Sequence, residues 1–143
     1  MRRDRKGFTL IEVLVVVAII VMLAGGAAIA VRNYYRGSQI DITKSKIEQV
    51  RSAVDAFHLK LNRLPSADKG LQELITVPDE EKEVDTWKQY GPFLVDGRIP
   101  TDAWGRDLQY ELTDSESGPT YRVYSYGPDG IEGTDDDIPA KAK

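Results

Sequence analysis

Gly7-Phe8-Thr9-Leu10-Ile11-Glu12 opens the segment that decides the fold of this 143-residue chain. From Phe8 to Val31, 20 of 24 residues are apolar, and none of the 19 residues from Val13 to Val31 is charged. At about 1.5 Å of rise per residue, a helix of this length crosses the hydrocarbon core of a bilayer. Residues 1–7 before it carry four basic side chains and one acidic side chain. We therefore expect a basic N-terminus, one membrane-length helix and a polar remainder.

Three interpretations of this N-terminal region compete: a permanent transmembrane anchor, a secretory signal peptide, and a leader that is cut before the apolar segment. Ala28-Ile29-Ala30 has the form of a signal-peptide cleavage site, but the apolar run Val13–Ala30 exceeds the roughly 7–15 residues of a signal-peptide core. The basic cluster before the segment is denser than the basic residues after it. This asymmetry favours a cytoplasmic N-terminus and a polar part outside the cytoplasm.

The composition excludes several classes of chemistry. The chain has no cysteine, which rules out a disulfide framework, a thiol nucleophile, a thiolate zinc site and a lipid-modified N-terminal cysteine. Its single histidine, His58, argues against a histidine-rich metal site and a serine–histidine triad. The net charge of −4 argues against a general nucleic-acid-binding protein.

The apolar periodicity continues beyond the membrane-length segment. Seven residues spaced by three or four form one stripe of an amphipathic helix: Ile40, Thr43, Ile47, Val50, Val54, Phe57 and Leu61. No proline occurs before Pro65, which predicts a continuous helix of roughly 80 Å from about Phe8 to Leu61. His58 lies off the stripe and is expected to face solvent.

The remaining sequence predicts a small mixed domain. A short helix capped by Ser66 or Asp68 would pack its apolar residues inward, and the acidic stretch from Pro78 to Asp85 reads as a loop. Alternating residues predict a strand over 108–112 and its hairpin partner over 121–126. The apolar residues expected inside are Leu71, Leu74, Ile75, Trp87, Tyr90, Phe93 and Leu94.

An acidic loop closes the chain between Tyr126 and Ile138. It holds five acidic residues and three glycines in 13 residues. Calcium takes six to eight oxygen ligands from carboxylates and carbonyls, and glycines let a backbone turn its carbonyls inward. The ligand spacing of an EF-hand is absent. The loop is therefore either a calcium site of another kind or a solvated acidic turn.

Glu12 is the one charged residue within the apolar segment Phe8–Val31, and it lies near the start of that segment. A carboxylate there costs free energy unless it has a partner or reaches the lipid headgroups. In its context, Gly7-Phe8-Thr9-Leu10-Ile11-Glu12 after a basic leader resembles the signature of the type IV pilin superfamily. The resemblance implies cleavage between Gly7 and Phe8 by a membrane peptidase, and methylation of the new N-terminus. Glu12 would then neutralise the amine of Phe8 on a neighbouring subunit as subunits stack.

Two further stretches resemble the major pseudopilins of type II secretion. One is Ile99-Pro100-Thr101-Asp102-Ala103-Trp104-Gly105, in which Ala103 replaces a proline, and the other is Arg63-Leu64-Pro65 with Gly70-Leu71-Gln72. The chain departs from the type IV pilin pattern that it resembles at Ile29, where many members of that superfamily carry proline. Gly25-Gly26 either supplies flexibility there or allows close helix packing.

The acidic loop resembles the calcium-binding loop of the same family. That resemblance implies carboxylate ligands from Asp129, Asp136 and Asp137, with Thr134 and the main-chain carbonyl of Tyr126 completing much of the shell. Asp135 and Glu132 are weaker candidates. Calcium is the only cofactor expected.

The resemblance implies an α+β, type IV pilin-like fold: a long N-terminal helix, half membrane-embedded and half amphipathic, packed on a small antiparallel sheet with a C-terminal metal-binding loop. The expected parts are a cleaved leader, residues 1–7; a transmembrane or fibre-core segment, residues 8–31; and a periplasmic domain, residues 32–143. The chain would be a non-enzymatic, single-pass protein of the bacterial inner membrane.

The implied function is that of a subunit polymerising into the periplasmic pseudopilus of a type II secretion system. Its partners would be copies of itself, minor pseudopilins, the inner-membrane assembly platform and the prepilin peptidase, and no nucleic acid. Two alternatives remain: a type IV pilin of a surface fibre, and a membrane-anchored calcium-binding module that never polymerises. A hydrolase using the aspartate cluster is disfavoured because adjacent Asp136 and Asp137 suggest no substrate cleft.

Overall fold

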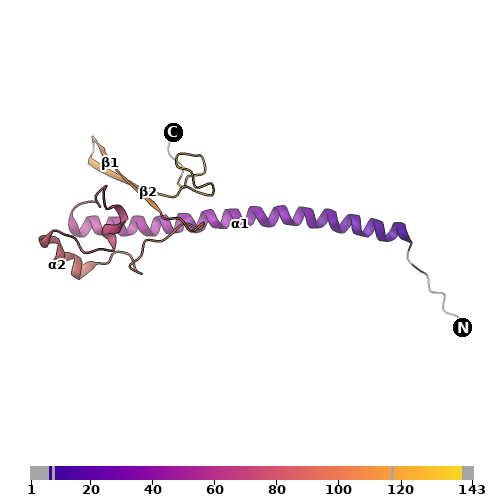
Figure 1. Ribbon diagram of the computed structural model, residues 1–143, viewed down its shortest axis with the longest axis horizontal. Coiled ribbons are helices and arrows are strands. Elements are labelled where there is room, and N and C mark those ends of the chain that lie inside the picture. The colour runs from indigo at the N-terminus through magenta and orange to yellow at the C-terminus, as the bar shows by residue number, and fades with distance from the viewer. Residues whose placement is uncertain (1–6, 8, 117, 140–143) are drawn as a thin grey trace. The chain divides into compact units, whose positions relative to one another are not determined.

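The computed structural model describes residues 7, 9–116 and 118–139 (Figure 1). The chain divides into two compact units, Met1–Ser38 and Gln39–Lys143, the second of which we call the head. The elements follow in the order α1 (Leu10–Leu61), a short 3-10 helix η1 (Gly70–Leu74), α2 (Glu81–Tyr90), β1 (Gln109–Ser115) and β2 (Gly118–Tyr124). The predicted domain limits after residues 7 and 31 stay predictions.

The first part of α1 is helical and exposed along its length. Residues 10–27 and 30–37 are all exposed, with Leu10 at 85% and Met22 at 82%. The helix passes through Gly25-Gly26 without interruption. Apart from the adjacent residues and the backbone of the neighbouring helical turns, no heavy atom of the described residues lies within 4 Å of where a Cβ would stand at either glycine. By length and composition, α1 qualifies as a candidate membrane span.

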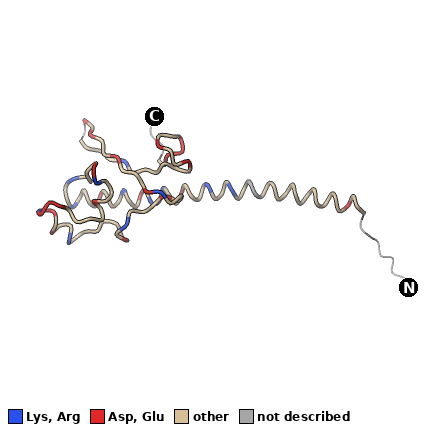
Figure 2. Tube along the Cα trace, in the orientation of Figure 1, with Lys and Arg blue, Asp and Glu red and all other residues tan. Residues whose placement is uncertain are grey.

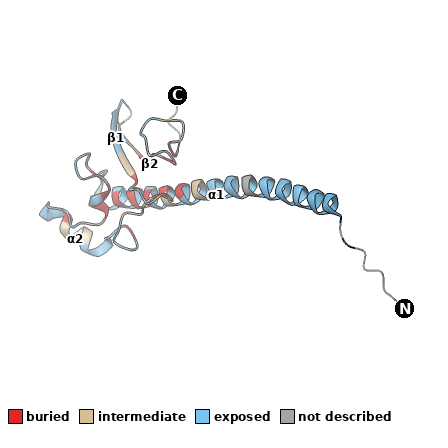
Figure 3. Cartoon of the chain, turned by 45° about the vertical axis from the view of Figure 1, so that its right-hand side comes forward, coloured by how far each residue is buried: buried red, intermediate tan, exposed pale blue. Residues whose placement is uncertain are grey.

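The last part of α1 forms the centre of the hydrophobic core. Thr43, Ile47, Val50, Val54 and Phe57 are at most 2% exposed, which confirms the stripe predicted from their spacing. Figure 3 shows buried positions on α1 within the head and exposed positions along the preceding part of the helix. The helix ends at Leu61, and Asn62 follows with a left-handed φ of 54°, a common way to terminate a helix. Exposed His58 also agrees with prediction.

Two short helices follow α1 in the head. The predicted helix after Pro65 is the 3-10 helix η1, which buries Leu71 and Leu74. Its N-cap is Lys69, which makes no side-chain capping bond; the Ser66 hydroxyl instead accepts a 3.3 Å hydrogen bond from the Lys69 amide. Neither predicted cap, Ser66 or Asp68, therefore occupies the N-cap position.

The prediction that residues 78–85 form a loop is wrong from Glu81 onward, where α2 begins. Acidic Glu81 and Glu83 lie in its first turn, where they interact favourably with the positive end of the helix dipole. Glu83 is also buried, at 8% exposed. Tyr90 was expected in the core but is 44% exposed, and the ammonium of Lys60 lies 4.0 Å from its ring centre.

Strands β1 and β2 form an antiparallel hairpin in register from Gln109–Tyr124 to Ser115–Gly118. This confirms the predicted hairpin, although the strands extend further into the turn than expected. The stacked rings of Tyr110 and Tyr121 lie across it, 6.1 Å apart. Leu108 before β1 and Val123 in β2 join the core formed by α1. The predicted fold, a long N-terminal helix packed on a small antiparallel sheet, is therefore confirmed.

Truncation of Phe57 is expected to destabilise the head. The ring is fully buried and makes an edge-to-face contact with Phe93 at 5.3 Å between ring centres. We expect Phe57→Ala to lower the free energy of unfolding by about 3–5 kcal/mol. Both tryptophans, Trp87 and Trp104, lie in the head, so urea unfolding followed by tryptophan fluorescence reports on it within the full chain.

The control is Leu59→Ala on the same part of α1, where the side chain is 79% exposed. Its effect should stay within about 0.5 kcal/mol, as is usual for surface positions. Equal losses in the two variants would contradict the placement of the core.

Candidate functional site

The first candidate site is the N-terminal turn of α1. The backbone amide of Glu12 donates to Thr9 Oγ1 at 3.3 Å, so Thr9 caps the helix. Thr9 and Glu12 have the spacing of a capping box, a sequence signal from which the Thr9 cap could have been predicted. Gly7 is exposed, and Phe8 lies outside the described residues. Glu12 is exposed at the start of the apolar segment.

The second candidate site is the loop between β2 and the C-terminus, which is closed at its base by backbone pairing. Ser125 and Ile138 exchange two hydrogen bonds, of 2.8 and 2.9 Å, and both are buried. Gly127 sits inside this closure with a left-handed φ of 64°. A Cβ at this position would lie 1.8 Å from the carbonyl oxygen of Asp136. Only glycine therefore lets the two sides of the loop approach this closely.

The carboxylate of Asp137 is the most unusual group in this loop. The residue is 4% exposed, and its Oδ2 accepts a 3.0 Å hydrogen bond from the Gly133 amide. Its Oδ1 is buried and has no hydrogen-bond partner among residues 7, 9–116 and 118–139. A buried charged oxygen without a partner is costly, and it is the kind of group that a bound cation satisfies.

The other predicted ligands lie on the same loop in different environments. Asp129 is exposed, and its Oδ1 accepts a 3.0 Å hydrogen bond from the Ile131 amide; this bond, together with the nearby Arg106, lowers the pKa of Asp129. Thr134 donates its hydroxyl to the Ile131 carbonyl at 3.2 Å, while Asp136 and Tyr126 are half-buried. Within residues 7, 9–116 and 118–139, the structure gathers no group of three or more acidic, histidine or cysteine side chains that could hold a metal ion. The calcium ligands stay a prediction.

Asp102 anchors the base of the loop from the turn before β1. It is 3% exposed and accepts hydrogen bonds from the amides of Trp104 and Arg106, both at 2.9 Å, and from the hydroxyl of Ser125 at 2.8 Å. Burial acts to raise the pKa of Asp102, but these hydrogen bonds and the Arg106 charge outweigh it and hold that pKa below its ordinary value.

Arg106 continues this connection into the loop by donating from Nη2 to the carbonyl of Gly127. The family resemblance pointed to the stretch that contains Asp102, but it did not predict that Asp102 and Arg106 connect this turn to the C-terminal loop. An aspartate followed closely by glycine predicts only a local tight turn. The bond from Ser125 to Asp102 and the bond from Arg106 to Gly127 each join residues more than 20 positions apart, so this local pattern does not predict them.

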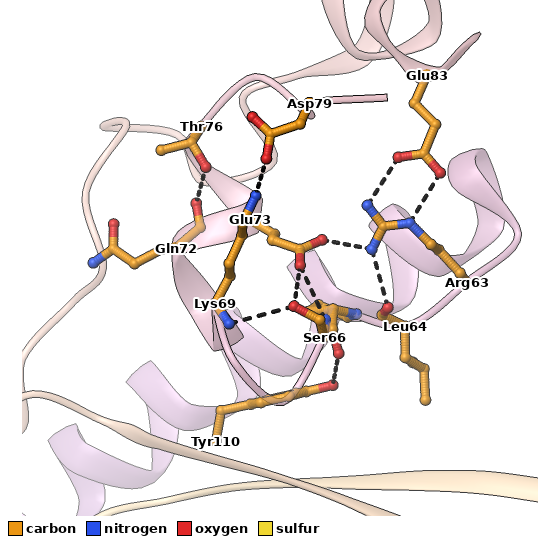
Figure 4. A network of polar contacts seen from close by, with 11 residues as sticks. Arg63, Leu64, Ser66, Lys69, Gln72, Glu73, Thr76, Asp79, Glu83 and Tyr110 are labelled. Carbon is orange, nitrogen blue, oxygen red and sulfur yellow. Dashed lines mark hydrogen bonds and ion pairs between the residues drawn. The ribbon is translucent and has the colours of Figure 1, made fainter. Parts of the chain in front are cut away.

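A third polar cluster joins the end of α1 to η1 and α2 (Figure 4). Arg63 donates to Glu83 with two hydrogen bonds, of 2.9 and 2.8 Å, and to Glu73 at 2.5 Å. Both glutamates are 8% exposed. Figure 4 shows the guanidinium between the two carboxylates, with Ser66 below the carboxylate of Glu73. One arginine therefore compensates two buried carboxylates from different segments.

Comparison with known proteins agrees with this architecture. Residues 30–141 match the family "Type II secretion system (T2SS), protein G", and residues 2–28 match the prokaryotic N-terminal methylation motif. The chain is 34% identical over 137 residues to type II secretion system core protein G of Klebsiella michiganensis, covering 96% of this chain and 93% of that protein. It is 33% identical over 135 residues to the core protein G of Pseudomonas aeruginosa, with 94% and 92% covered.

A solved structure is also similar to this chain. The major pseudopilin from the type 2 secretion system of enterohaemorrhagic Escherichia coli matches with a TM-score of 0.58 and 27% identity, covering 78% of this chain and 92% of that one. The long helix with an apolar first part and a small α+β head defines a type IV pilin-like protein. Within that class, the chain belongs to the type II secretion system protein G family.

Removal of Arg63 is expected to destabilise the head strongly. Arg63→Ala leaves Glu73 and Glu83 buried without a counter-charge, a change that usually costs 3–5 kcal/mol. Because the Arg63 side chain is itself 33% exposed, we expect about 3 kcal/mol in the urea unfolding assay. The control is Arg51→Ala, which breaks an exposed pair with Glu48 and should change the free energy of unfolding by at most about 1 kcal/mol. An Arg63→Ala effect no larger than the control would show that the cluster is not stabilising.

Proposed function

We propose that this chain is a structural subunit that polymerises into the periplasmic pseudopilus of a type II secretion system. The observation that carries the proposal is the exposed apolar part of α1, which needs either lipid or neighbouring subunits to cover it. Membership of the protein G family and the structural likeness to a major pseudopilin support the same conclusion. The chain needs no catalytic group for this task, because assembly depends on complementary surfaces. We favour this over a surface-fibre pilin because the curated relatives are secretion proteins.

The proposed assembly pathway begins with removal of the leader. A prepilin peptidase would cut between Gly7 and Phe8 and methylate the amine of Phe8, in line with the match of residues 2–28 to the methylation motif. The processed subunit would remain in the inner membrane through α1, with its head in the periplasm. There it would meet other copies of itself, minor pseudopilins and the inner-membrane assembly platform.

Glu12 would set the register of the polymer. Cleavage before Phe8 would leave a cationic amine one helical turn from a carboxylate, and both groups would be costly in the apolar centre of a fibre. Pairing the amine of one subunit with Glu12 of the next removes both costs only when the subunits are correctly stacked. The Thr9 cap supports this role because it keeps the first turn of α1 ordered around Glu12.

Loss of Glu12 is expected to reduce assembly more than folding. We expect Glu12→Ala to lower the yield of fibres, measured by electron microscopy, by at least about tenfold. A loss of about 1.4 kcal/mol of binding free energy at each subunit contact already corresponds to a tenfold lower affinity. The matched control is Glu48→Ala, which removes the same charge from an exposed site in the head and should leave assembly intact. Normal fibres from Glu12→Ala would contradict the register role.

Processing is checked on the same proteins by their intact mass. The mature chain should begin at a methylated Phe8 in the wild-type protein, in Glu12→Ala and in Glu48→Ala. A chain that keeps Met1, or one shortened through Ala30, would instead support a membrane-anchored module that does not polymerise.

We further propose that the loop between Ser125 and Ile138 holds a calcium ion that stiffens the head. The ligands would be the carboxylates of Asp129, Asp136 and Asp137, with Thr134 and the carbonyl of Tyr126. The unpartnered, buried Oδ1 of Asp137 supports a cation at this place. Calcium would supply two positive charges to these three carboxylates, and the chain has no disulfide to restrain the loop instead.

Calcium is expected to raise the melting temperature of the head, and a chelator to lower it. At a hundredfold excess over the dissociation constant, a ligand that binds only the folded state adds about 2.7 kcal/mol of stability. Asp137→Asn should abolish the calcium response, while Asp135→Asn, at an exposed position of the same loop, should largely retain it. The measurement is thermal unfolding by tryptophan fluorescence, with magnesium as the control ion. Identical melting curves in calcium and in chelator would exclude the site.

A further inference from the structure

Arg106 reaches from the turn before β1 into the loop between Ser125 and Ile138. This loop contains five acidic residues and no lysine or arginine, and Figure 2 shows its acidic positions before the C-terminus. Arg106 donates from Nη2 to the carbonyl oxygen of Gly127, although the two residues are 21 positions apart in the sequence. The proposed ligands of the calcium site do not account for this contact.

We propose that Arg106 is a positioning residue that holds residues 127–130, the first half of the loop, in the conformation that binds calcium. The inference rests on the proposed calcium site and adds to it a group from outside the loop. Gly127 lies between two predicted ligands, the carbonyl of Tyr126 and the carboxylate of Asp129. Because peptide groups are planar, a bond that fixes the Gly127 carbonyl restrains the backbone that carries both ligands.

The guanidinium group of Arg106 lies against both ends of this half of the loop. At one end it binds the Gly127 carbonyl, and at the other it fills the space beside Gly130. A Cβ at Gly130 would collide with Nη1 of Arg106 and lie 3.2 Å from its Cζ. Gly130 also has a left-handed φ of 71°. Glycine at this position therefore makes the turn and leaves room for the arginine.

Asp102 holds the same guanidinium group from the other side. Its Oδ2 accepts a 3.3 Å hydrogen bond from Nε of Arg106, and the Asp102 side chain is 1% exposed. An arginine carries its donors in a rigid fork, so it can bind a carboxylate and a carbonyl at the same time. Because Asp102 neutralises the charge of Arg106, it offsets the repulsion between Arg106 and a bound cation. The effect of Arg106 on calcium affinity is therefore one of position.

The second half of the loop, residues 131–137, contains bonds of a more local kind. The amide of Gly133 donates to Oδ2 of Asp137 at 3.0 Å, and the amide of Asp137 donates to the carbonyl of Thr134 at 3.3 Å. Oδ1 of Asp137, which has no hydrogen-bond partner in the described part of the chain, also belongs to this half. Calcium would order the second half, whereas Arg106 orders the first half without the ion. A site that is partly ordered in advance binds its ligand more tightly.

Hydrogen exchange of the full chain in detergent micelles with a chelator tests the role of Arg106 without calcium. The amides of Gly127 and Ile131 report on the first half of the loop, because both donate hydrogen bonds in the structure. Peptides covering residues 126–131 should exchange at least about tenfold faster in Arg106→Gln than in the wild-type protein. The control is Arg98→Gln, which removes the same charge from an exposed side chain of the head and should leave the exchange unchanged.

Calcium affinity, measured by isothermal titration calorimetry on the same proteins, separates positioning from charge. Ordering the backbone of one residue changes an equilibrium constant by roughly tenfold, so Arg106→Gln should weaken calcium binding about tenfold. Arg106→Lys keeps the charge but loses the fork of donors, and it should weaken binding to a similar extent. Tighter binding by Arg106→Gln would show that the arginine acts as a repelling charge and would overturn the inference.

Urea unfolding in chelator shows whether each variant is folded before calcium is added. In Arg106→Gln, Asp102 keeps its hydrogen bonds from the backbone amides at positions 104 and 106 and from the Ser125 hydroxyl, so the head should fold. Arg106→Lys retains a counter-charge for Asp102 and decides the question if Arg106→Gln does not fold.

The two measurements distinguish this inference from the proposed calcium site. A wild-type protein that binds no calcium would contradict the calcium site, while exchange in chelator would still decide whether Arg106 holds the first half of the loop. Unchanged exchange, or unchanged calcium affinity, in both Arg106 variants would overturn this inference and leave the calcium site standing.

Discussion

The burial of apolar surface by a single helix is the constraint on which this structure depends. The part of α1 within the head buries a stripe from Thr43 to Phe57 against its own chain. The preceding part presents apolar side chains all round and buries none of them in the described residues. One α-helix can be buried along a stripe in the head and exposed in its preceding part, because its backbone hydrogen bonds are internal whether the side chains face lipid, protein or water. What changes along α1 is only the distribution of its side chains.

The head covers one apolar stripe of α1 with few residues and without a disulfide. Its two-stranded hairpin is too small to be stable alone, so Leu108 and Val123 gain their burial from α1. Polar connections complete the packing at two points. Arg63 forms ion pairs with Glu73 of η1 and Glu83 of α2 and so connects these two helices. Asp102 accepts a hydrogen bond from Ser125 and so connects the turn before β1 to the loop between Ser125 and Ile138.

The elements that the sequence predicted well are those whose signals are local. The spacing of Ile47, Val50 and Val54 predicts the buried face because helix geometry alone relates these residues. The start of α2 was missed because Glu83 looks like a solvated charge until Arg63, 20 residues earlier, is brought beside it. Tyr90 was misplaced for the same kind of reason, since its ring lies under Lys60 of α1. The loop was recognised by its composition, but the isolation of Asp137 Oδ1 depends on the closure between Ser125 and Ile138.

The composition of the core has a consequence for the order of events during synthesis. The stripe on α1 is complete once Phe57 has been made, yet Leu108, Val123 and Ile138, which share its core, follow roughly 50 to 80 residues later. Until then the nascent chain carries an uncovered apolar face. The core of the head is therefore complete only after Ile138 has been made, and until then the uncovered face of α1 is exposed to aggregation.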